Sequence, residues 1–352
     1  MQLTPEQQFV IKELIQIKKP VQSLGGYAGT GKTTVIKHLD KLLPNWAVCA
    51  YTGKAANVLR KKGLESSTIH SLIYKPDMDD AGHIKKDNNG SPMFVLNPDF
   101  SAEGILCDEA SMVNKEIYQD LLSFNKPIIF VGDHGQLEPI GSDINLMANP
   151  DYRLEQIHRN AGPIAYFAEF VRKGYRPAAY TQGGDVVTFI DKRYAESVFN
   201  KVNQIICGFN RSRVDINKEV RKAAGYPDKW PVLGEKVMCL RNNKQLGLFN
   251  GMQGTVEHLA SKPKNKMTFF SDGISYDVLF DPHSFNKERQ EQNYGRDDPM
   301  PFEFCYAATC HKCQGDEFDK VLVIEQKCKS WDFRRWAYTA ASRAKTHLVW
   351  AI

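Results

Sequence analysis

The stretch GYAGTGKT, from Gly26 to Thr33, fits the pattern G-x4-G-K-[ST] and decides how the first half of the chain is expected to fold. It follows a short apolar run, Val21 to Leu24, and opens into TTVIKHLDKLL, whose apolar residues have helical spacing. Between a strand and a helix, such a turn points backbone N–H groups at phosphate oxygens, and the helix N-terminus adds partial positive charge. The sequence therefore predicts a nucleotide-binding loop formed by Gly26, Ala28, Gly29, Thr30, Gly31, Lys32, Thr33 and Thr34.

The expected ligand is ATP with Mg²⁺, because Lys32 can bridge the β- and γ-phosphates while the Thr33 hydroxyl joins the metal shell. Such a site needs a carboxylate on a neighbouring strand. GILCDEASM supplies it, since an apolar strand there ends in Asp108 and Glu109. Asp108 would hold Mg²⁺ through water, and Glu109 would polarise the attacking water. Asp-Glu at a strand end is usually a solvated loop, but the phosphate loop favours the catalytic interpretation.

A third strand, PIIFVGD, runs from Pro127 to Asp133 and is followed by HGQLEPI. Strands that alternate with helical patterns favour a parallel sheet covered on both faces. This arrangement is that of an ATPase core, which many unrelated machines share, so it does not by itself name an activity.

The composition is that of a globular protein, with 42% apolar and 25% charged residues and a net charge of +5. A length of 352 residues favours two domains. No run of about 18 apolar residues occurs, and the N-terminal stretch lacks the pattern of a secretory signal. Eight cysteines without such a signal are typical of reduced thiols. We expect a soluble cytoplasmic protein that does not contact a membrane.

Several further sequence blocks indicate which kind of ATPase this chain is. They are AYTGKAANVLRKKG (50–63), SSTIHSL (66–72), GDHGQLEPI (132–140), LEQIHRN (154–160), HKCQG (311–315) and RRWAYTAASRAKTHLVW (334–350). In order and type they resemble the motifs of superfamily 1 helicases, and most closely the class B branch with its RecD-like and Dda-like members. The resemblance runs from Gln7 to the C-terminal strand. Two positions depart from the family pattern: Tyr51, where Pro is frequent, and Ser342, where Thr is commoner.

The resemblance implies an α/β fold with two RecA-like P-loop domains and parallel sheets. The expected boundaries are 1–72 with 98–175 for the first motor domain and 176–255 with 302–352 for the second. A β-hairpin insertion is expected at 73–97, and a small barrel-like, SH3-like insertion at 256–301.

The resemblance also assigns roles to individual residues. Gln136, Arg159 and Arg343 would act in catalysis, with Arg343 as an arginine finger; Gly315 and Glu317 would contact the nucleotide. The resemblance places Gln7 against adenine, although Thr4-Pro5-Glu6-Gln7 is also a helix capping box. The implied DNA contacts are Thr52, Lys54, Thr68, His70, Asn210, Asn250, His311 and Lys312.

Inside the expected hairpin, HIKKDNNGSPMFVL has a turn signal from Asp87 to Gly90 between strand-like flanks. An ordinary surface hairpin would explain it. Class B relatives carry a strand-separating pin at this place, however, and Met93 and Phe94 follow the polar turn. We therefore expect Phe94 to contact DNA at the point where the strands part.

Three cysteines, Cys305, Cys310 and Cys313, have the spacing C-x4-C-x2-C, and Cys328 follows. This spacing could hold an iron–sulfur cluster, and a single Cys-x-x-Cys could bind zinc. The surrounding residues, from Thr309 to Glu317, instead match the helicase block position by position, with the cysteines at its variable positions. We predict that the cysteines bind no metal.

Taken together, these patterns predict an ATP-dependent DNA helicase that moves 5′→3′ on single-stranded DNA, acts at single-strand/duplex junctions and works as a monomer. Single-strand-binding or replication proteins are candidate partners, in a bacterial cell or a phage-infected host. The alternatives are an RNA helicase of the same superfamily, an ATP-driven translocase or switch that does not unwind, and a metal-dependent redox protein.

Overall fold

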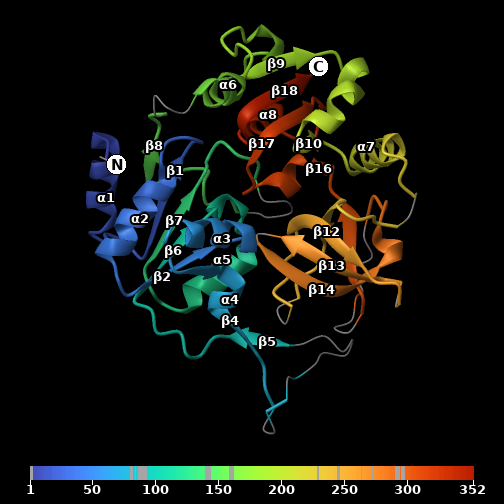
Figure 1. Cartoon of the computed structure of the whole chain (residues 1–352). Coiled ribbons are helices and arrows are strands. Elements are labelled where there is room, and N and C mark those ends of the chain that lie inside the picture. Colours follow the sequence, from blue (N-terminus) through green and yellow to red (C-terminus); the bar gives the residue numbers. More distant parts are fainter. Residues whose placement is uncertain are drawn as a thin grey trace. The chain divides into compact units, whose positions relative to one another are not determined.

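The computed structural model describes residues 3–79, 82–83, 85, 93–138, 144–157, 162–227, 230–243, 246–262, 264–271, 273–289, 294 and 298–352. The chain divides into two compact units, unit 1 from Met1 to Arg172 and unit 2 from Lys173 to Ile352. Each contains a parallel sheet with helices, and unit 2 also contains a small closed barrel (Figure 1). The predicted fold class is therefore confirmed.

Unit 1 alternates strands and helices along the chain. Its elements are α1 (Pro5–Leu14), β1 (Val21–Gly26), α2 (Lys32–Leu42), β2 (Trp46–Ala50), α3 (Gly53–Lys61), β3 (Ser66–Thr68), α4 (Ile69–Ile73), β4 (Tyr74–Pro76), β5 (Phe94–Leu96), β6 (Gly104–Asp108), η1 (Ala110–Met112), α5 (Lys115–Ser123), β7 (Ile128–Gly132), β8 (Tyr152–Leu154) and α6 (Gly162–Arg172).

Six of these strands form one parallel sheet in the order β3-β2-β6-β7-β1-β8. β1 pairs with β7 so that Gly25 lies opposite Gly132, and β6 pairs with β7 so that Cys107 lies opposite Phe130. The carboxyl ends of neighbouring parallel strands lie at the same edge of a sheet. The segments after β1, β6 and β7 therefore meet at one edge.

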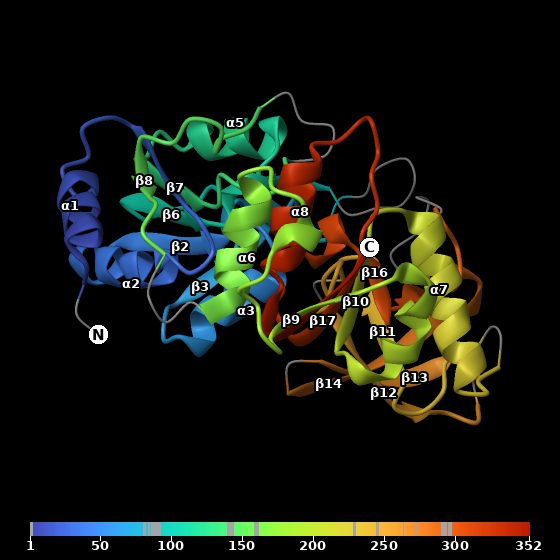
Figure 2. The same cartoon turned by 90° about the horizontal axis from the view of Figure 1, so that it is seen from above.

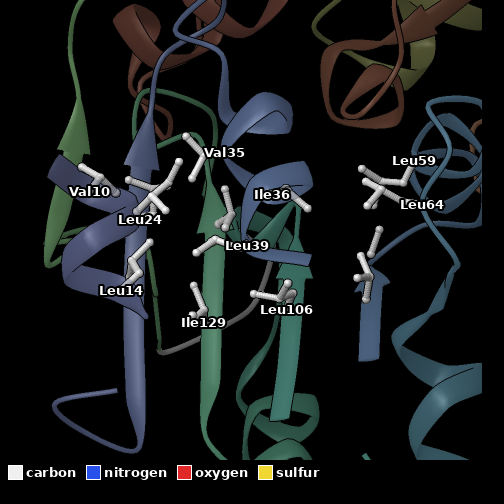
Figure 3. Close-up of a cluster of buried hydrophobic side chains, with 14 of the residues drawn as sticks. Val10, Leu14, Leu24, Val35, Ile36, Leu39, Leu59, Leu64, Leu106 and Ile129 are labelled. Carbon is white, nitrogen blue, oxygen red and sulfur yellow. The ribbon is translucent and has the colours of Figure 1, made fainter. Parts of the chain in front are cut away.

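Helices cover both faces of this sheet, and α2 and α5 lie on opposite sides of it (Figure 2). One buried cluster joins apolar residues of α1, α2 and α3 to one face of the sheet (Figure 3). Another joins α4, α5 and η1 to the other face. Because both faces are covered, the strands β6 and β7 are apolar and almost wholly buried, as expected of a parallel sheet.

The expected hairpin insertion is formed by β4 and β5, which pair antiparallel with Pro76 opposite Phe94. Farther out, the Met93 N–H donates to the Lys85 carbonyl at 2.8 Å. The predicted turn from Asp87 to Gly90 lies outside the described residues. β5 itself pairs with β4, the segment that follows α4.

Unit 2 is built on a second parallel sheet, in the order β16-β10-β17-β18-β9. Its elements are η3 (Pro177–Ala179), β9 (Val187–Ile190), η4 (Lys192–Lys201), β10 (Gln204–Cys207), α7 (Asn210–Ala223), β11 (Lys236–Cys239), β12 (Gln253–Leu259), β13 (Lys266–Ser271), β14 (Ile274–Asp281), η5 (Pro282–Ser284), β15 (Met300–Phe304), β16 (Ala307–Thr309), η6 (Cys310–Cys313), β17 (Phe318–Ile324), α8 (Phe333–Ala341) and β18 (Ala344–Ala351).

The barrel of unit 2 consists of the strands β11 to β15 around a core that includes Phe269, Phe280 and Phe302. Its strands begin at Lys236 and end at Phe304, so it extends beyond the expected segment 256–301 at both ends. The reason is closure: β15 pairs with β11, which brings a strand from before the expected segment into the barrel. In the part of the chain that the structure describes, no helix has the length and apolar character needed to cross a membrane.

The core of unit 1 can be tested on a single helix. Leu39 is fully buried, whereas Leu42 of the same helix α2 is 53% exposed. We predict that Leu39→Ala lowers the unfolding free energy of unit 1 by about 2–5 kcal/mol, because it leaves a cavity under the sheet. Leu42→Ala should change it by less than about 0.5 kcal/mol. Denaturant midpoints, with hydrogen exchange of unit 1 peptides, measure both; equal shifts would show that the core is assigned wrongly.

Candidate nucleotide-binding site and nucleic-acid interface

The predicted phosphate loop joins β1 to α2, and its shape depends on three glycines. Gly29 and Gly31 have left-handed backbone angles, with φ of 79° and 83°, which side chains rarely adopt. A Cβ on Gly26 would lie 2.8 Å from Thr30 Oγ1 and 2.9 Å from Lys32 Cγ. The loop is therefore folded too tightly for any other residue at this position, and its curled backbone suits phosphate oxygens.

Lys32, the first residue of α2, extends back over this loop. Its ammonium donates to the carbonyls of Gly26 at 2.7 Å and Tyr27 at 3.1 Å, and lies 3.8 Å from Asp133 Oδ2. The ammonium is thus held at the mouth of the curled backbone. On the next residue, the Thr33 hydroxyl accepts from Lys62 Nζ at 3.4 Å.

Asp108 and Glu109 follow β6 at the same edge of the sheet, as predicted. Asp108 Oδ1 accepts from the Glu109 N–H at 2.9 Å. Burial raises the pKa of the Asp108 carboxyl, and the Glu109 N–H, Lys32 and Lys62 oppose that rise. Glu109 itself has a left-handed backbone, φ 54° and ψ 38°. Such angles are unfavourable for a residue with a side chain and are concentrated at functional sites.

A further carboxylate, that of Asp133, was given no role from the sequence. Asp133 is the residue directly after β7, and it is 1% exposed. Its oxygens accept from the Gly135 N–H at 2.9 Å and from Gln136 Nε2 at 3.3 Å, and it faces Lys32. The parallel pairing of β1 with β7 places Asp133 close to the phosphate loop, and a prediction of this pairing could have identified Asp133 as a site residue. Gln136, a predicted catalytic residue, is thereby positioned beside the lysine of the loop.

An aromatic contact braces the loop from outside. The rings of Tyr27 and His134 lie 4.1 Å apart, and the Arg172 guanidinium carbon lies 3.9 Å from the centre of the Tyr27 ring. Burial lowers the pKa of His134 to about 4, so this ring is neutral near pH 7. A Cβ on Gly25 would approach His134 Nδ1 to 2.7 Å, so glycine is required here too.

Gln7 has both of the roles considered for it within reach. The capping box is present: the Gln7 N–H donates to Thr4 Oγ1 at 3.2 Å, and Gln7 Oε1 accepts from the Thr4 N–H at 3.1 Å. In addition, Gln7 Nε2 donates to the Thr30 carbonyl at 3.1 Å. The buried amide therefore ties α1 to the phosphate loop.

These residues fit a nucleoside triphosphate with Mg²⁺. The curled backbone and Lys32 match anionic phosphate oxygens, while the Thr33 hydroxyl and the Asp108 carboxylate are the oxygen ligands that Mg²⁺ prefers.

The predicted arginine finger, Arg343, belongs to unit 2 and follows α8. Its guanidinium is 5% exposed and donates to the Thr339 carbonyl at 3.0 Å, the Asp316 carbonyl at 3.1 Å and Ser342 Oγ at 2.8 Å. Ser342, one of the two departures from the family pattern, thus supports the arginine directly. None of the described residues forms an ion pair with Arg343, so neutral acceptors hold its full positive charge. Nearby, Gly315 has φ 77° and Glu317 is exposed.

In unit 1, two predicted DNA contacts begin helices. Thr52 Oγ1 accepts from the Ala55 N–H at 3.1 Å, and Thr68 Oγ1 from the Ser71 N–H at 3.1 Å. Both hydroxyls thus have a capping role. Thr68 ends β3 and Thr52 lies shortly after the paired strand β2, so both lie at the same edge as the phosphate loop. The His70 ring lies between Tyr51 and Tyr74, at 6.4 and 5.8 Å. Lys54 lies in the first turn of α3.

In unit 2, the predicted DNA contacts lie in three segments. Asn210 is the exposed first residue of α7, and Asn250 is exposed in the connection between β11 and β12. His311 and Lys312 lie in η6; burial lowers the pKa of His311. Lys312 Nζ lies 3.6 Å from Glu303 Oε1 of the barrel strand β15. Glu303 is buried and also pairs with Arg213 of α7, so one carboxylate of the barrel contacts both Lys312 and α7.

Arg159 and Phe94 are the two remaining residues predicted for the site. Arg159 lies outside the described residues. Phe94 begins β5, and Met93, Phe94, Val95 and Leu96 are exposed in succession by 44, 45, 42 and 38%. Four consecutive exposed apolar residues are unusual on a protein surface and typical of a contact site.

The cysteines considered as metal ligands from their spacing lie in unit 2. Cys305, Cys310 and Cys313 are fully buried, and Cys328 is half-buried. Burial raises the pKa of the Cys310 and Cys313 thiols, which keeps them protonated. Among the described residues, no group of three or more His, Cys, Asp or Glu side chains could hold a metal ion.

Comparison with known proteins agrees with this geometry. Residues 2–190, just over half of the chain, match the AAA domain family. The chain belongs to this family. Membership implies that the AAA domain binds a nucleotide. Residues 304–350, which include η6, Arg343 and β18, match the UvrD-like helicase C-terminal domain.

Individual relatives confirm the resemblance to superfamily 1 class B helicases. The chain is 25% identical over 260 residues to the ATP-dependent DNA helicase dda of Enterobacteria phage T4, a match that covers 65% of this chain and 58% of that protein. It is 24% identical over 411 residues to the RecBCD enzyme subunit RecD of Mycolicibacterium smegmatis, covering 95% and 68%.

Among solved structures, Bacteroides Pif1 bound to ssDNA superposes with a TM-score of 0.61 at 20% identity, covering 100% of this chain and 92% of that one. At 20% sequence identity, this structural similarity supports the fold of the chain and nothing further. The match to the T4 relative spans less than two thirds of that relative's length.

The prediction that the cysteines bind no metal can be tested directly. We expect Cys310→Ala with Cys313→Ala to leave ATPase activity within about twofold of the unchanged chain, because both thiols are fully buried in unit 2 and are not exposed to a ligand. Cys239→Ala, in the barrel core, is a matched control for the loss of a buried thiol. Metal analysis of the purified chain should find no stoichiometric iron or zinc. One metal per chain, lost in the double variant, would overturn the interpretation.

Proposed function

We propose that this chain is an ATP-dependent DNA helicase that translocates 5′→3′ on single-stranded DNA and separates duplexes. The observation that carries the proposal is the convergence of Lys32, Asp108 with Glu109, and Asp133 at one edge of a parallel sheet, around a loop shaped for phosphate. The names of the relatives, which include a DNA helicase of phage T4 and a RecBCD subunit, support DNA as the substrate.

ATP bound with Mg²⁺ supplies a γ-phosphoryl group that transfers to water. For this to occur, the Lys32 ammonium exchanges the carbonyls of Gly26 and Tyr27 for phosphate oxygens. Thr33 and Asp108 hold the metal. Glu109 accepts a proton from the attacking water, and Gln136, held by Asp133, orients that water.

Arg343 and Arg159 stabilise the charge that develops on the transferred group, because a planar guanidinium spreads over several phosphate oxygens. Arg343 has neutral hydrogen-bond partners in unit 2, so it reaches a phosphate without breaking an ion pair.

The proposed DNA contacts are hydroxyl, amide and cationic side chains that favour phosphates over base edges. Thr52, Lys54, Thr68 and His70 contribute from unit 1, and Asn210, Asn250, His311 and Lys312 from unit 2. Recognition of the backbone gives affinity without dependence on sequence, as a translocating protein requires. We further propose that the chain acts as a monomer in the cytoplasm of a bacterium or phage-infected cell, beside single-strand-binding or replication proteins.

The nucleotide chemistry can be tested by four variants. Lys32→Ala and Glu109→Gln should abolish DNA-stimulated ATP hydrolysis, because they remove the phosphate cation and the base. Arg343→Ala should lower turnover by about 10³-fold, the usual contribution of an arginine finger. Lys41→Ala, an exposed lysine of the same helix α2, is the control and should behave like the unchanged chain. Near-normal hydrolysis by Glu109→Gln would show that the base is assigned wrongly.

The hairpin of β4 and β5 is proposed to part the strands, with Phe94 capping the last base pair. Stacking contributes about 1.4 kcal/mol per base-pair step, so a ring that covers the exposed pair can decide whether it opens. We predict that Phe94→Ala reduces duplex unwinding at least tenfold, while ATPase and single-strand translocation persist. Phe9→Ala, also an exposed phenylalanine of unit 1, should change none of these rates. If unwinding and ATPase fall together in Phe94→Ala, the hairpin has a structural role only.

A further inference from the structure

An exposed aromatic ring lies at the start of α7 in unit 2, shortly after β10 ends. Phe209 is the N-cap residue of this 14-residue helix and is 38% exposed. Ser, Thr, Asp or Asn would normally occupy an N-cap, because their side chains accept a backbone N–H of the first turn. Phe209 provides no such acceptor. Helix stability therefore does not explain a phenylalanine at this position.

The ring is braced from one side by a stack of aromatic side chains. Phe209 lies on Trp331 with a centroid distance of 5.0 Å and an interplanar angle of 26°. Trp331 in turn stacks on the fully buried Trp336 at 6.2 Å and 9°, and Phe333 stacks on the same Trp336 at 5.9 Å and 18°. The stack thus runs from the core of unit 2 to its surface and ends at Phe209.

The backbone around the ring is built to hold this stack. A Cβ on Gly208 would lie 2.7 Å from Trp331 Cη2, so glycine is needed for the indole to fit. The side chain of Gln326 fixes the turn: its Oε1 accepts the N–H groups of Gly208 at 2.7 Å and Phe209 at 3.3 Å, and its Nε2 donates to Ser212 Oγ at 2.7 Å. Phe209 is therefore presented on a rigid support.

The surroundings favour an anionic ligand with a flat aromatic group. The first N–H groups of α7 receive no acceptor from the N-cap side chain, and the helix dipole is positive there. Arg211 lies two residues after Phe209 in the first turn of α7, and its side chain is 81% exposed; Lys327 follows the turn-fixing Gln326, and its side chain is 66% exposed. Asp215 lies 3.9 Å from Arg211 and Glu325 lies 3.1 Å from Lys327, so both cations are partly compensated.

We propose that Phe209 is a base-stacking site: one base of the bound single strand lies on its ring, and the adjoining phosphate lies at the N-terminus of α7. This inference rests on the proposed function and adds to it a contact with a base, in addition to the contacts with phosphates. The predicted phosphate contact Asn210 is the next residue, so base and phosphate of one nucleotide are held together. Stacking tolerates any sequence because every base has a π-face.

The test compares oligothymidylate with an oligonucleotide of equal length whose residues are abasic, each titrated against the full chain without ATP. Loss of one stacked base is expected to weaken oligothymidylate binding roughly tenfold in Phe209→Ala. Binding of the abasic strand should stay within about twofold, and Phe209→Tyr should restore discrimination. The dependence of affinity on salt should not change, because no phosphate contact is lost. Phe9→Ala and the unfolding midpoint control for nonspecific effects.

The outcomes separate the two proposals. If the unchanged chain binds neither strand, the proposed function is wrong and this inference falls with it. If it binds oligothymidylate and Phe209→Ala weakens both strands equally, the ring only supports the fold of α7. If Phe209→Ala changes neither, no base of the bound strand stacks on the ring. Either of the last two results overturns the base-stacking site while leaving the helicase proposal in place.

Discussion

The parallel pairing of β6, β7 and β1 is the constraint on which the candidate site depends. Parallel strands bring their carboxyl ends to one edge, so the phosphate loop, the Asp108–Glu109 pair and Asp133 meet although they lie far apart in the sequence. Burial of both faces of the sheet, in two separate apolar clusters, keeps this register fixed. A one-residue slip of β6 would turn its buried side chains to the opposite face and move both carboxylates from the loop.

At this edge, several residues have backbone conformations or surroundings that are locally unfavourable. Gly26 and Gly25 are surrounded so closely that no side chain fits, and Glu109 holds a left-handed backbone that its Cβ disfavours. The carboxyl group of Asp108 is buried, and burial raises its pKa. Similar features occur in unit 2, where Phe209 occupies an N-cap without capping and Arg343 keeps its charge among neutral acceptors. Departures from local preference of this kind are expected at functional positions.

Local patterns made much of this structure predictable. The strand, glycine loop and helix around Lys32, the capping box of Thr4 and Gln7, and the strand that ends in Asp108 each need only a short window of sequence. Features that depend on distant pairing were missed. Asp133 gains its role from the neighbouring β1, and β11 enters the barrel by pairing with β15. β5 pairs with β4, which lies earlier in the chain than the residues beside the predicted turn at Asp87. The stack under Phe209 depends on Trp331, from a different strand connection.

The central claim is that nucleotide hydrolysis at the edge of unit 1 drives directed strand separation. Its most direct measurement is strand displacement by the full chain, with ATP and Mg²⁺, on otherwise identical duplexes that carry a single-stranded tail at the 5′ or the 3′ end. We predict rapid displacement of the 5′-tailed duplex, none of the 3′-tailed or blunt duplex, and none without ATP. Displacement of only the 3′-tailed duplex, or ATP hydrolysis with no displacement of either, would contradict it.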